Sequence, residues 1–124
     1  MKLLLFIAFG GALGAVMRYL ATGWVNQMTD KGFPYGTLFV NVTGSLLIGL
    51  LTVYLLDKAS VSDEMRAGLL VGVLGSFTTF STFSMDTLSL FEQGAMTAAF
   101  MNIVLSVTVC LAAVWLGMVI GRQL

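Results

Sequence analysis

The stretch GSFTTFSTFSMD, residues 75–86, combines hydroxyl side chains and phenylalanines within an otherwise apolar chain. Hydroxyl groups donate hydrogen bonds and phenyl ring edges carry positive partial charge, so together they can replace water around a small anion. These hydroxyls also favour a helix break near Gly75–Thr79, because they compete for backbone hydrogen bonds. A break would free carbonyl oxygens, which suit a cation such as Na⁺. The alternative is an ordinary packing helix whose phenylalanines fill gaps between its neighbours.

Two further polar sites interrupt apolar stretches. Asn41 lies in the segment NVTGS, where a buried amide requires hydrogen-bond partners. It either joins helices together or faces an ion pathway. Asn102 and Ser106 are four residues apart, and Cys110 follows after four more, so the three share one helix face. This face is weakly polar, and its serine can also satisfy itself on a backbone carbonyl.

Two charged residues lie within or near the apolar stretches. Arg18 either extends to the lipid headgroups or attracts an anion into an aqueous vestibule. Asp86 is a functional candidate because carboxylates are costly in a membrane. Its alternatives are contact with headgroups or an ion pair with Arg18, which the topology places on the same side.

The composition indicates an integral membrane protein. Hydrophobic residues make up 58% of the 124-residue chain and charged residues 10%, whereas soluble domains carry about 25% charged residues. The chain has no histidine and only one cysteine, Cys110, which excludes ordinary Cys/His zinc sites and an internal disulfide. With the commonest general base absent and a net charge of zero, we expect neither an enzyme nor a nucleic-acid-binding protein.

Four apolar stretches have the length of about 20 residues that a bilayer requires. We expect membrane-spanning helices over about 3–25, 34–56, 63–91 and 95–121, with the third broken near its middle. The third stretch would be roughly 43 Å long as a straight helix, so it can contain a break and still cross about 30 Å of hydrocarbon. Ser62 is suited to cap its start. The sequence predicts one all-α membrane domain over residues 1–124.

Glycines recur four residues apart in three of these stretches, which predicts close helix packing in lipid. The pairs are Gly10/Gly14, Gly68/Gly72 and Gly117/Gly121. Four helices alone are few to enclose a pathway, so we expect oligomers.

Basic residues give a weak bias for orientation. With both ends on one side, that side carries Lys2, Lys58, Arg66 and Arg122, and the other carries Arg18 and Lys31. The count leaves open a single orientation with a cytoplasmic N-terminus, and insertion in both directions as an antiparallel homodimer.

The segments GGALGAVMRY, GTLFVNVTGSLLIG and GSFTTFSTFS together resemble the Fluc (CrcB) family of small bacterial fluoride channels. The similarity spans the whole chain. It implies an antiparallel, dual-topology homodimer in the bacterial inner membrane, with two fluoride pores and one structural Na⁺ ion. The function implied is passive export of cytoplasmic fluoride.

The resemblance also implies roles for individual residues. The pore would be lined by Asn41, Phe80, Phe83, Ser81, Thr82, Asn102 and Ser106. Backbone carbonyls of Gly75 and Thr78 would hold the Na⁺ ion, and Arg18 would belong to the vestibule. The family often has Glu where this chain has Asp86, a difference that we expect to affect conductance rather than fold. Cys110 stands where a hydroxyl would extend the polar face of the fourth helix.

Two other functions were compared with this one. A small dual-topology multidrug or cation exporter would be expected to carry a carboxylate within its first helix. This first stretch contains none, and its internal ionisable residue is Arg18. A membrane scaffold would explain the glycine pairs but not Asn41 together with the phenylalanine-bearing third stretch.

Overall fold

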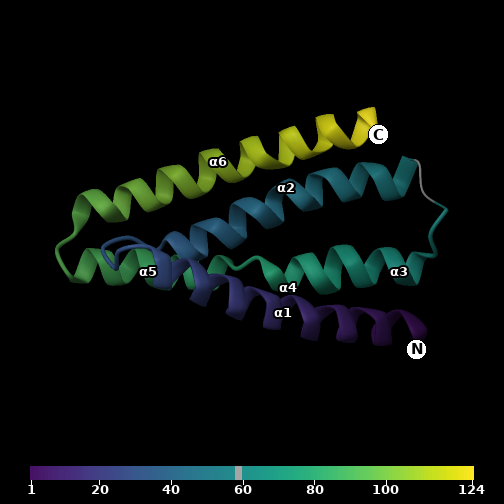
Figure 1. Cartoon of the computed structure of the whole chain (residues 1–124), viewed down its shortest axis with the longest axis horizontal. Coiled ribbons are helices and arrows are strands. Elements are labelled where there is room, and N and C mark those ends of the chain that lie inside the picture. The colour runs from purple at the N-terminus through teal and green to yellow at the C-terminus, as the bar shows by residue number, and fades with distance from the viewer. Residues whose placement is uncertain (58–59) are drawn as a thin grey trace.

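The computed structural model describes residues 1–57 and 60–124, and these residues form helices joined by short connections (Figure 1). The first two long helices are α1 (Lys2–Met28) and α2 (Tyr35–Asp57), and the last is α6 (Met96–Gln123). The third span consists of α3 (Asp63–Ala67), η1 (Gly68–Leu74), α4 (Gly75–Phe77) and α5 (Phe80–Glu92). Lys58, counted above in the charge bias, lies outside the described residues.

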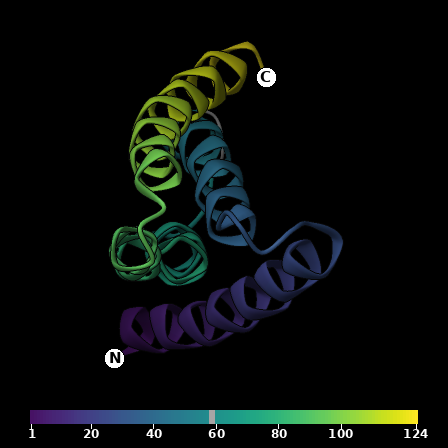
Figure 2. The same ribbon diagram turned by 90° about the vertical axis from the view of Figure 1, so that its left-hand side faces the viewer.

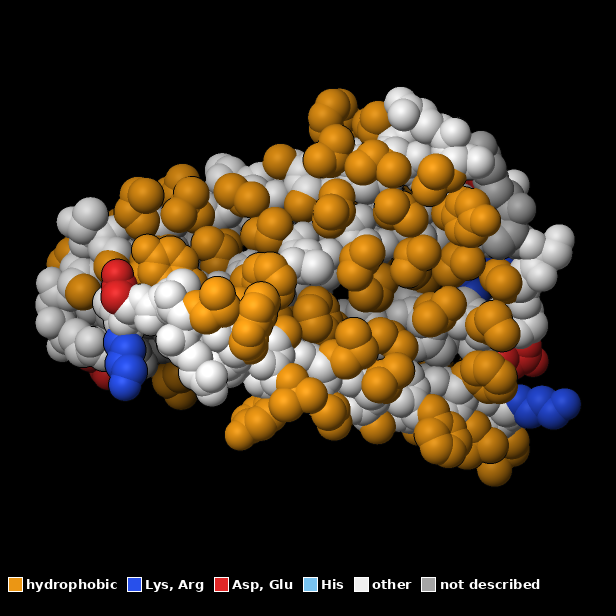
Figure 3. All heavy atoms as spheres, viewed as in Figure 1, with side chains coloured by type: hydrophobic (Ala, Val, Ile, Leu, Met, Phe, Trp, Pro, Cys, Tyr) orange, Lys and Arg blue, Asp and Glu red, His pale blue; other side chains and the backbone are white. Residues whose placement is uncertain are grey.

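Four helical spans in the described part of the chain are long and apolar enough to cross a membrane. They are Lys2–Met28, Tyr35–Asp57, Asp63–Glu92 and Met96–Gln123, which confirms the four predicted stretches with small shifts at their ends. Hydrophobic side chains cover most of the face seen in Figure 3, and the charged side chains visible there lie towards its two ends. This distribution suits a protein surrounded by lipid along its length.

The four spans pack as two pairs, as the end view in Figure 2 shows. Helix α6 lies along α2, and α1 lies along the first half of the third span. Glycines allow both contacts. A Cβ atom on Gly10 would collide with the carbonyl oxygen of Gly68, and one on Gly117 would collide with that of Leu46. The glycine pairs therefore do mediate close packing, as predicted from their spacing.

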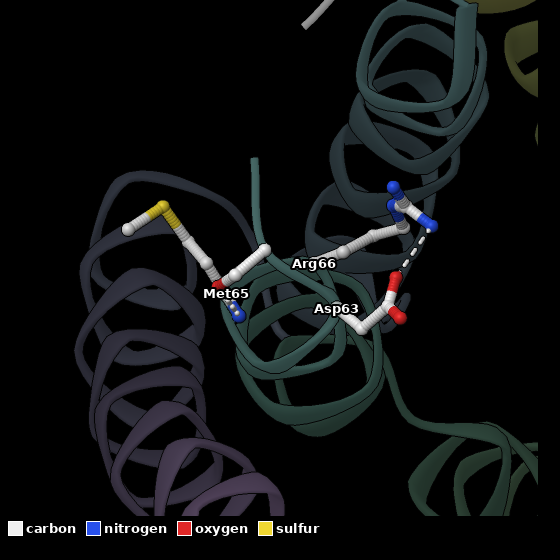
Figure 4. A network of polar contacts seen from close by, with 4 residues as sticks. Asp63, Met65 and Arg66 are labelled. Carbon is white, nitrogen blue, oxygen red and sulfur yellow. Dashed lines mark hydrogen bonds and ion pairs between the residues drawn. The ribbon is translucent and has the colours of Figure 1, made fainter. Parts of the chain in front are cut away.

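The third span begins as the sequence predicts. The Ser62 hydroxyl accepts a hydrogen bond of 3.2 Å from the Met65 N–H, which caps the helix. Arg66 forms an ion pair with Asp63 one turn away, at 3.2 Å (Figure 4). Because Asp63 is exposed, this pair contributes little to stability.

Residues Gly68–Leu74 form a π-helix, which the sequence analysis did not predict. A π-helix is wider than an α-helix and forms hydrogen bonds five residues apart. Two glycines of this segment face α1: an added Cβ on Gly72 would lie 2.8 Å from the Ile7 carbonyl oxygen, and one on Gly68 3.1 Å from that of Phe6. The widened turn therefore lies where two backbones approach each other closely.

The helix break predicted near Gly75–Thr79 is present but narrower. Gly75–Phe77 are still helical, and the chain becomes extended only at Thr78 (φ −84°, ψ 157°) and Thr79 (φ −151°, ψ 112°). Helix α5 starts directly afterwards at Phe80. The two adjacent threonines, rather than the glycine, occupy the interruption.

Candidate functional site

The Asn41 side chain holds the extended peptide at the break. Its amide oxygen accepts a hydrogen bond of 2.7 Å from the Thr79 N–H, and its amide nitrogen donates one of 3.0 Å to the Thr79 carbonyl. Gly44, one turn further along α2, leaves room for Thr78, because an added Cβ would overlap the Thr78 methyl group. Asn41 therefore joins α2 to the third span, as one of the two sequence interpretations proposed.

The Thr79 side chain starts the next helix. Its Oγ1 accepts a hydrogen bond of 3.2 Å from the Thr82 N–H and lies 3.0 Å from Thr82 Oγ1. Thr79 is 6% exposed, so these contacts are shielded from solvent. Threonine is a favoured N-cap residue because its hydroxyl satisfies a backbone donor that the helix leaves free.

Arg18 approaches the break from α1. One guanidinium nitrogen donates to the Thr78 carbonyl oxygen at 3.4 Å. The same arginine lines a cavity of about 610 Å³, whose other polar residues include Thr22, Asn26, Thr79 and Thr82. Arg18 therefore places a positive charge beside this cavity, and its role in a vestibule stays a prediction.

A second cavity, which Thr79 also lines, contains four of the seven predicted pore residues. Its volume is about 390 Å³, and its lining includes Asn41, Phe80, Phe83, Ser106 and Cys110. The Phe80 and Phe83 rings are tilted by 50° with their centres 5.3 Å apart. Phe83 is 9% exposed, whereas Phe80 is 78% exposed in the single chain. The exposed ring marks this face as the open side of the cavity.

Asn102 and Ser106 belong to a buried hydrogen-bond chain between α6 and α5. Asn102, only 1% exposed, donates to Thr87 Oγ1 at 2.9 Å, and Thr87 donates to the Phe83 carbonyl at 2.7 Å. Ser106 lies against the other end of the Asn102 amide, donating to Oδ1 at 3.4 Å. The weakly polar face predicted on the fourth helix therefore points into the protein and connects to the backbone of Phe83.

Asp86 accepts a hydrogen bond of 2.7 Å from the Thr37 hydroxyl, which joins α5 to α2. Both residues line a polar cavity of about 400 Å³ that also contains Asp30 and Lys31. Asp86 and Arg18 thus have different partners, contrary to the alternative in which they form an ion pair.

The predicted pore residues do not all meet in one place. Thr82 lines the Arg18 cavity and the Asp86 cavity, and Ser81 is exposed with its hydroxyl 3.3 Å from Thr79 Oγ1. Three side chains that form these hydrogen bonds were not predicted from the sequence: those of Thr79, Thr37 and Thr87. Of the three, only Thr79 could have been predicted, because threonine is a common N-cap residue and Thr79 directly precedes the helix that follows the break.

The fold and site define a class of protein: a multi-pass membrane protein whose broken third span lines two cavities, one beside Arg18 and one around Phe80 and Phe83. Comparison with known proteins identifies the family. Residues 5–118 match the family model described as "CrcB-like protein, Camphor Resistance (CrcB)", so the chain belongs to this family.

Curated relatives carry the name "Fluoride-specific ion channel FluC". The protein of Geobacter metallireducens is 50% identical over 95% of this chain and 95% of its own length. That of Geotalea uraniireducens is 44% identical over the full length of both chains. The Methylococcus capsulatus protein is 50% identical over this whole chain, which spans 55% of that relative's length. Relatives named as channels agree with the expectation that this protein is not an enzyme.

Proposed function

We propose that this protein is a fluoride-selective channel that allows cytoplasmic fluoride to leave the cell passively across the bacterial inner membrane. The observation that carries the proposal is the cavity in which Phe80 and Phe83 lie beside Asn41 and Ser106. Ring edges, hydroxyls and amide N–H groups suit an anion. The family supports fluoride as that anion, since its curated relatives are named for it.

Permeation through this cavity requires a fluoride ion to lose much of its water. One N–H of the Asn41 amide donates to the Thr79 carbonyl, and the second can donate to the ion because an amide nitrogen carries two hydrogens. The edges of Phe80 and Phe83 supply further positive partial charge. The Ser106 hydroxyl, whose one hydrogen makes a long contact of 3.4 Å with Asn102 Oδ1, would turn from that contact to donate to the ion. Selectivity against chloride follows from a narrow path, since a larger ion cannot approach all of these groups at once.

The working form is an antiparallel, dual-topology homodimer with two pores. One chain leaves the Phe80 ring 78% exposed at the side of the cavity. A second copy would cover this ring and close the pathway. The weak charge bias of the sequence is compatible with insertion in both directions.

A structural Na⁺ ion would lie between the broken third helices of the two copies. The donor set fits, because carbonyl oxygens of interrupted helices bind Na⁺ in other membrane proteins. The residues that would hold it are Gly75, which starts the last helical turn before the break, and Thr78, which lies within the break. The ion would stabilise the facing carbonyl dipoles of the two subunits.

The cation-exporter alternative is not favoured. Helix α1 carries Lys2 and Arg18 as its ionisable cationic residues and contains no Asp or Glu. A site for cationic drugs would require negative charge there.

The deciding experiment is anion efflux from liposomes that contain only this purified protein. We expect rapid efflux of fluoride and little efflux of chloride under the same gradient. Equal rates for both ions, or no fluoride efflux above that of empty liposomes, would contradict the proposal.

A further inference from the structure

The carbonyl groups of Gly75 and Thr78 would both be occupied if the third span were one continuous α-helix. In such a helix each carbonyl accepts a hydrogen bond from the N–H four residues later. The donor for Gly75 would be the N–H of Thr79, and the donor for Thr78 would be the N–H of Thr82. Removing both donors leaves these two oxygens more accessible to a cation.

In the structure, both of these N–H groups donate to side-chain oxygens instead of to the Gly75 and Thr78 carbonyls. The Thr79 N–H donates to Asn41 Oδ1 at 2.7 Å. The Thr82 N–H donates to Thr79 Oγ1 at 3.2 Å. One side chain from α2 and one from the break itself therefore replace the two carbonyls as acceptors.

We propose that Asn41 and Thr79 are positioning residues for the cation: their side chains keep the Gly75 and Thr78 carbonyls free of helical donors. The inference rests on the proposed channel with its structural Na⁺ ion and adds a second role for Asn41 beside the pore. Thr79 has no proposed role in the pore: its hydroxyl acts only on the backbone of α5, by capping that helix at the Thr82 N–H.

The surroundings make this arrangement rigid. Thr79 is 6% exposed, and the Asn41 side chain forms hydrogen bonds with both its N–H and its carbonyl. The Thr78 carbonyl oxygen also accepts a hydrogen bond of 3.4 Å from the Arg18 guanidinium. This long contact leaves a lone pair for a cation, because a carbonyl oxygen has two.

The test compares Thr79→Val with Thr79→Ser. Valine has nearly the shape of threonine but cannot accept from the Thr82 N–H, whereas serine can. The measurement is the thermal unfolding midpoint of the purified protein in detergent, titrated with NaCl against N-methylglucamine chloride at constant ionic strength. We expect sodium to raise the midpoint of the wild type and of Thr79→Ser. For Thr79→Val, we expect the sodium concentration that gives half of the effect to rise at least about tenfold.

Two further variants separate this role from the pore. Phe80→Ile alters the cavity without touching the break, so it should lose fluoride efflux and keep the sodium response. Asn41→Leu should lose both. Thr79→Ala, which also lacks the acceptor, replaces Thr79→Val if the valine variant does not fold.

The outcomes distinguish this inference from the channel proposal. An unchanged sodium response in Thr79→Val or Thr79→Ala, and in Asn41→Leu, would overturn the positioning role. A wild type that conducts fluoride but shows no sodium response would overturn it as well, with the channel proposal intact. A wild type that does not conduct fluoride would contradict the channel, whereas selective loss of its sodium response in the variants would still support the positioning role.

Discussion

Phe80 is 78% exposed in one chain and lines the candidate pore, so the proposed dimer would change its environment strongly. Phe80→Ile removes a ring edge that would replace water around fluoride. We expect fluoride efflux to fall at least about tenfold, which corresponds to about 1.4 kcal/mol in the barrier. Efflux from liposomes measures this.

Phe9→Ile is the matched control for this prediction. Phe9 is 75% exposed on α1 and lines an apolar groove rather than the Phe80 cavity. We expect its efflux rate to match that of the wild type. Equal rates for the two variants would mean that the Phe80 ring has no role in permeation.

Asn102 connects the backbone of α5 to α6 from a fully enclosed position. Asn102→Leu removes the donor to Thr87 and leaves polar groups without partners, and such a loss costs about 1–3 kcal/mol. We expect a lower thermal unfolding midpoint in detergent. Thr108→Val is the control, because Thr108 is exposed on the same helix and bonds only locally, to the Val104 carbonyl. A midpoint for Asn102→Leu equal to that of the control would contradict the structural role of this network.

Among the helices, the contact between α1 and η1 depends on the close approach of their two backbones. A side chain at Gly10 would collide with the Gly68 carbonyl, and backbone cannot move aside as a side chain can. We expect Gly10→Ala to lower the unfolding midpoint, because overpacking of this kind costs about 1–3 kcal/mol.

Gly23→Ala provides the comparison for Gly10→Ala. An added Cβ on Gly23 has nothing within 4 Å, and alanine favours helix formation. We expect this variant to be as stable as the wild type or slightly more stable. Equal losses in both variants would indicate a general intolerance of α1 rather than a specific collision.

The elements were predictable to different degrees from the sequence. Hydrophobic length alone predicts the four spans, because a bilayer imposes a minimum length on each helix. The π-helix at Gly68–Leu74 was missed, since its winding depends on how closely α1 approaches. The break was predicted from its threonines, but its limits depend on Asn41, which is 38 residues away along the chain.

The candidate site was also predictable only in part, because some of its contacts depend on how the helices pack against one another. The residue types and the family resemblance named Asn41, Phe80, Phe83 and Ser106, and the structure brings these four to one cavity. The partners of Asp86 and Arg18 could not be read from the sequence, because they depend on which faces of α1, α2 and α5 meet.

The proposed dual topology gives a prediction for the assembled protein. Gln93 lies exposed in the connection between α5 and α6, so Gln93→Cys in a Cys110→Ser background places one thiol at one end of the bundle. We expect a membrane-impermeant maleimide to label about half of the chains in intact cells, because each dimer would contain one copy in each orientation. Complete labelling, or labelling only after cell lysis, would indicate a single orientation.

The dependence of the break on Asn41 also has a consequence for the order of assembly in the membrane. Before α2 packs against the third span, the Thr79 N–H has no side-chain acceptor from another helix, and lipid offers none. The newly inserted segment Asp63–Glu92 is therefore expected to enter the bilayer as one uninterrupted helix. It would break at Thr78–Thr79 only when it packs against α2, so that the broken geometry of this span is a late product of biogenesis.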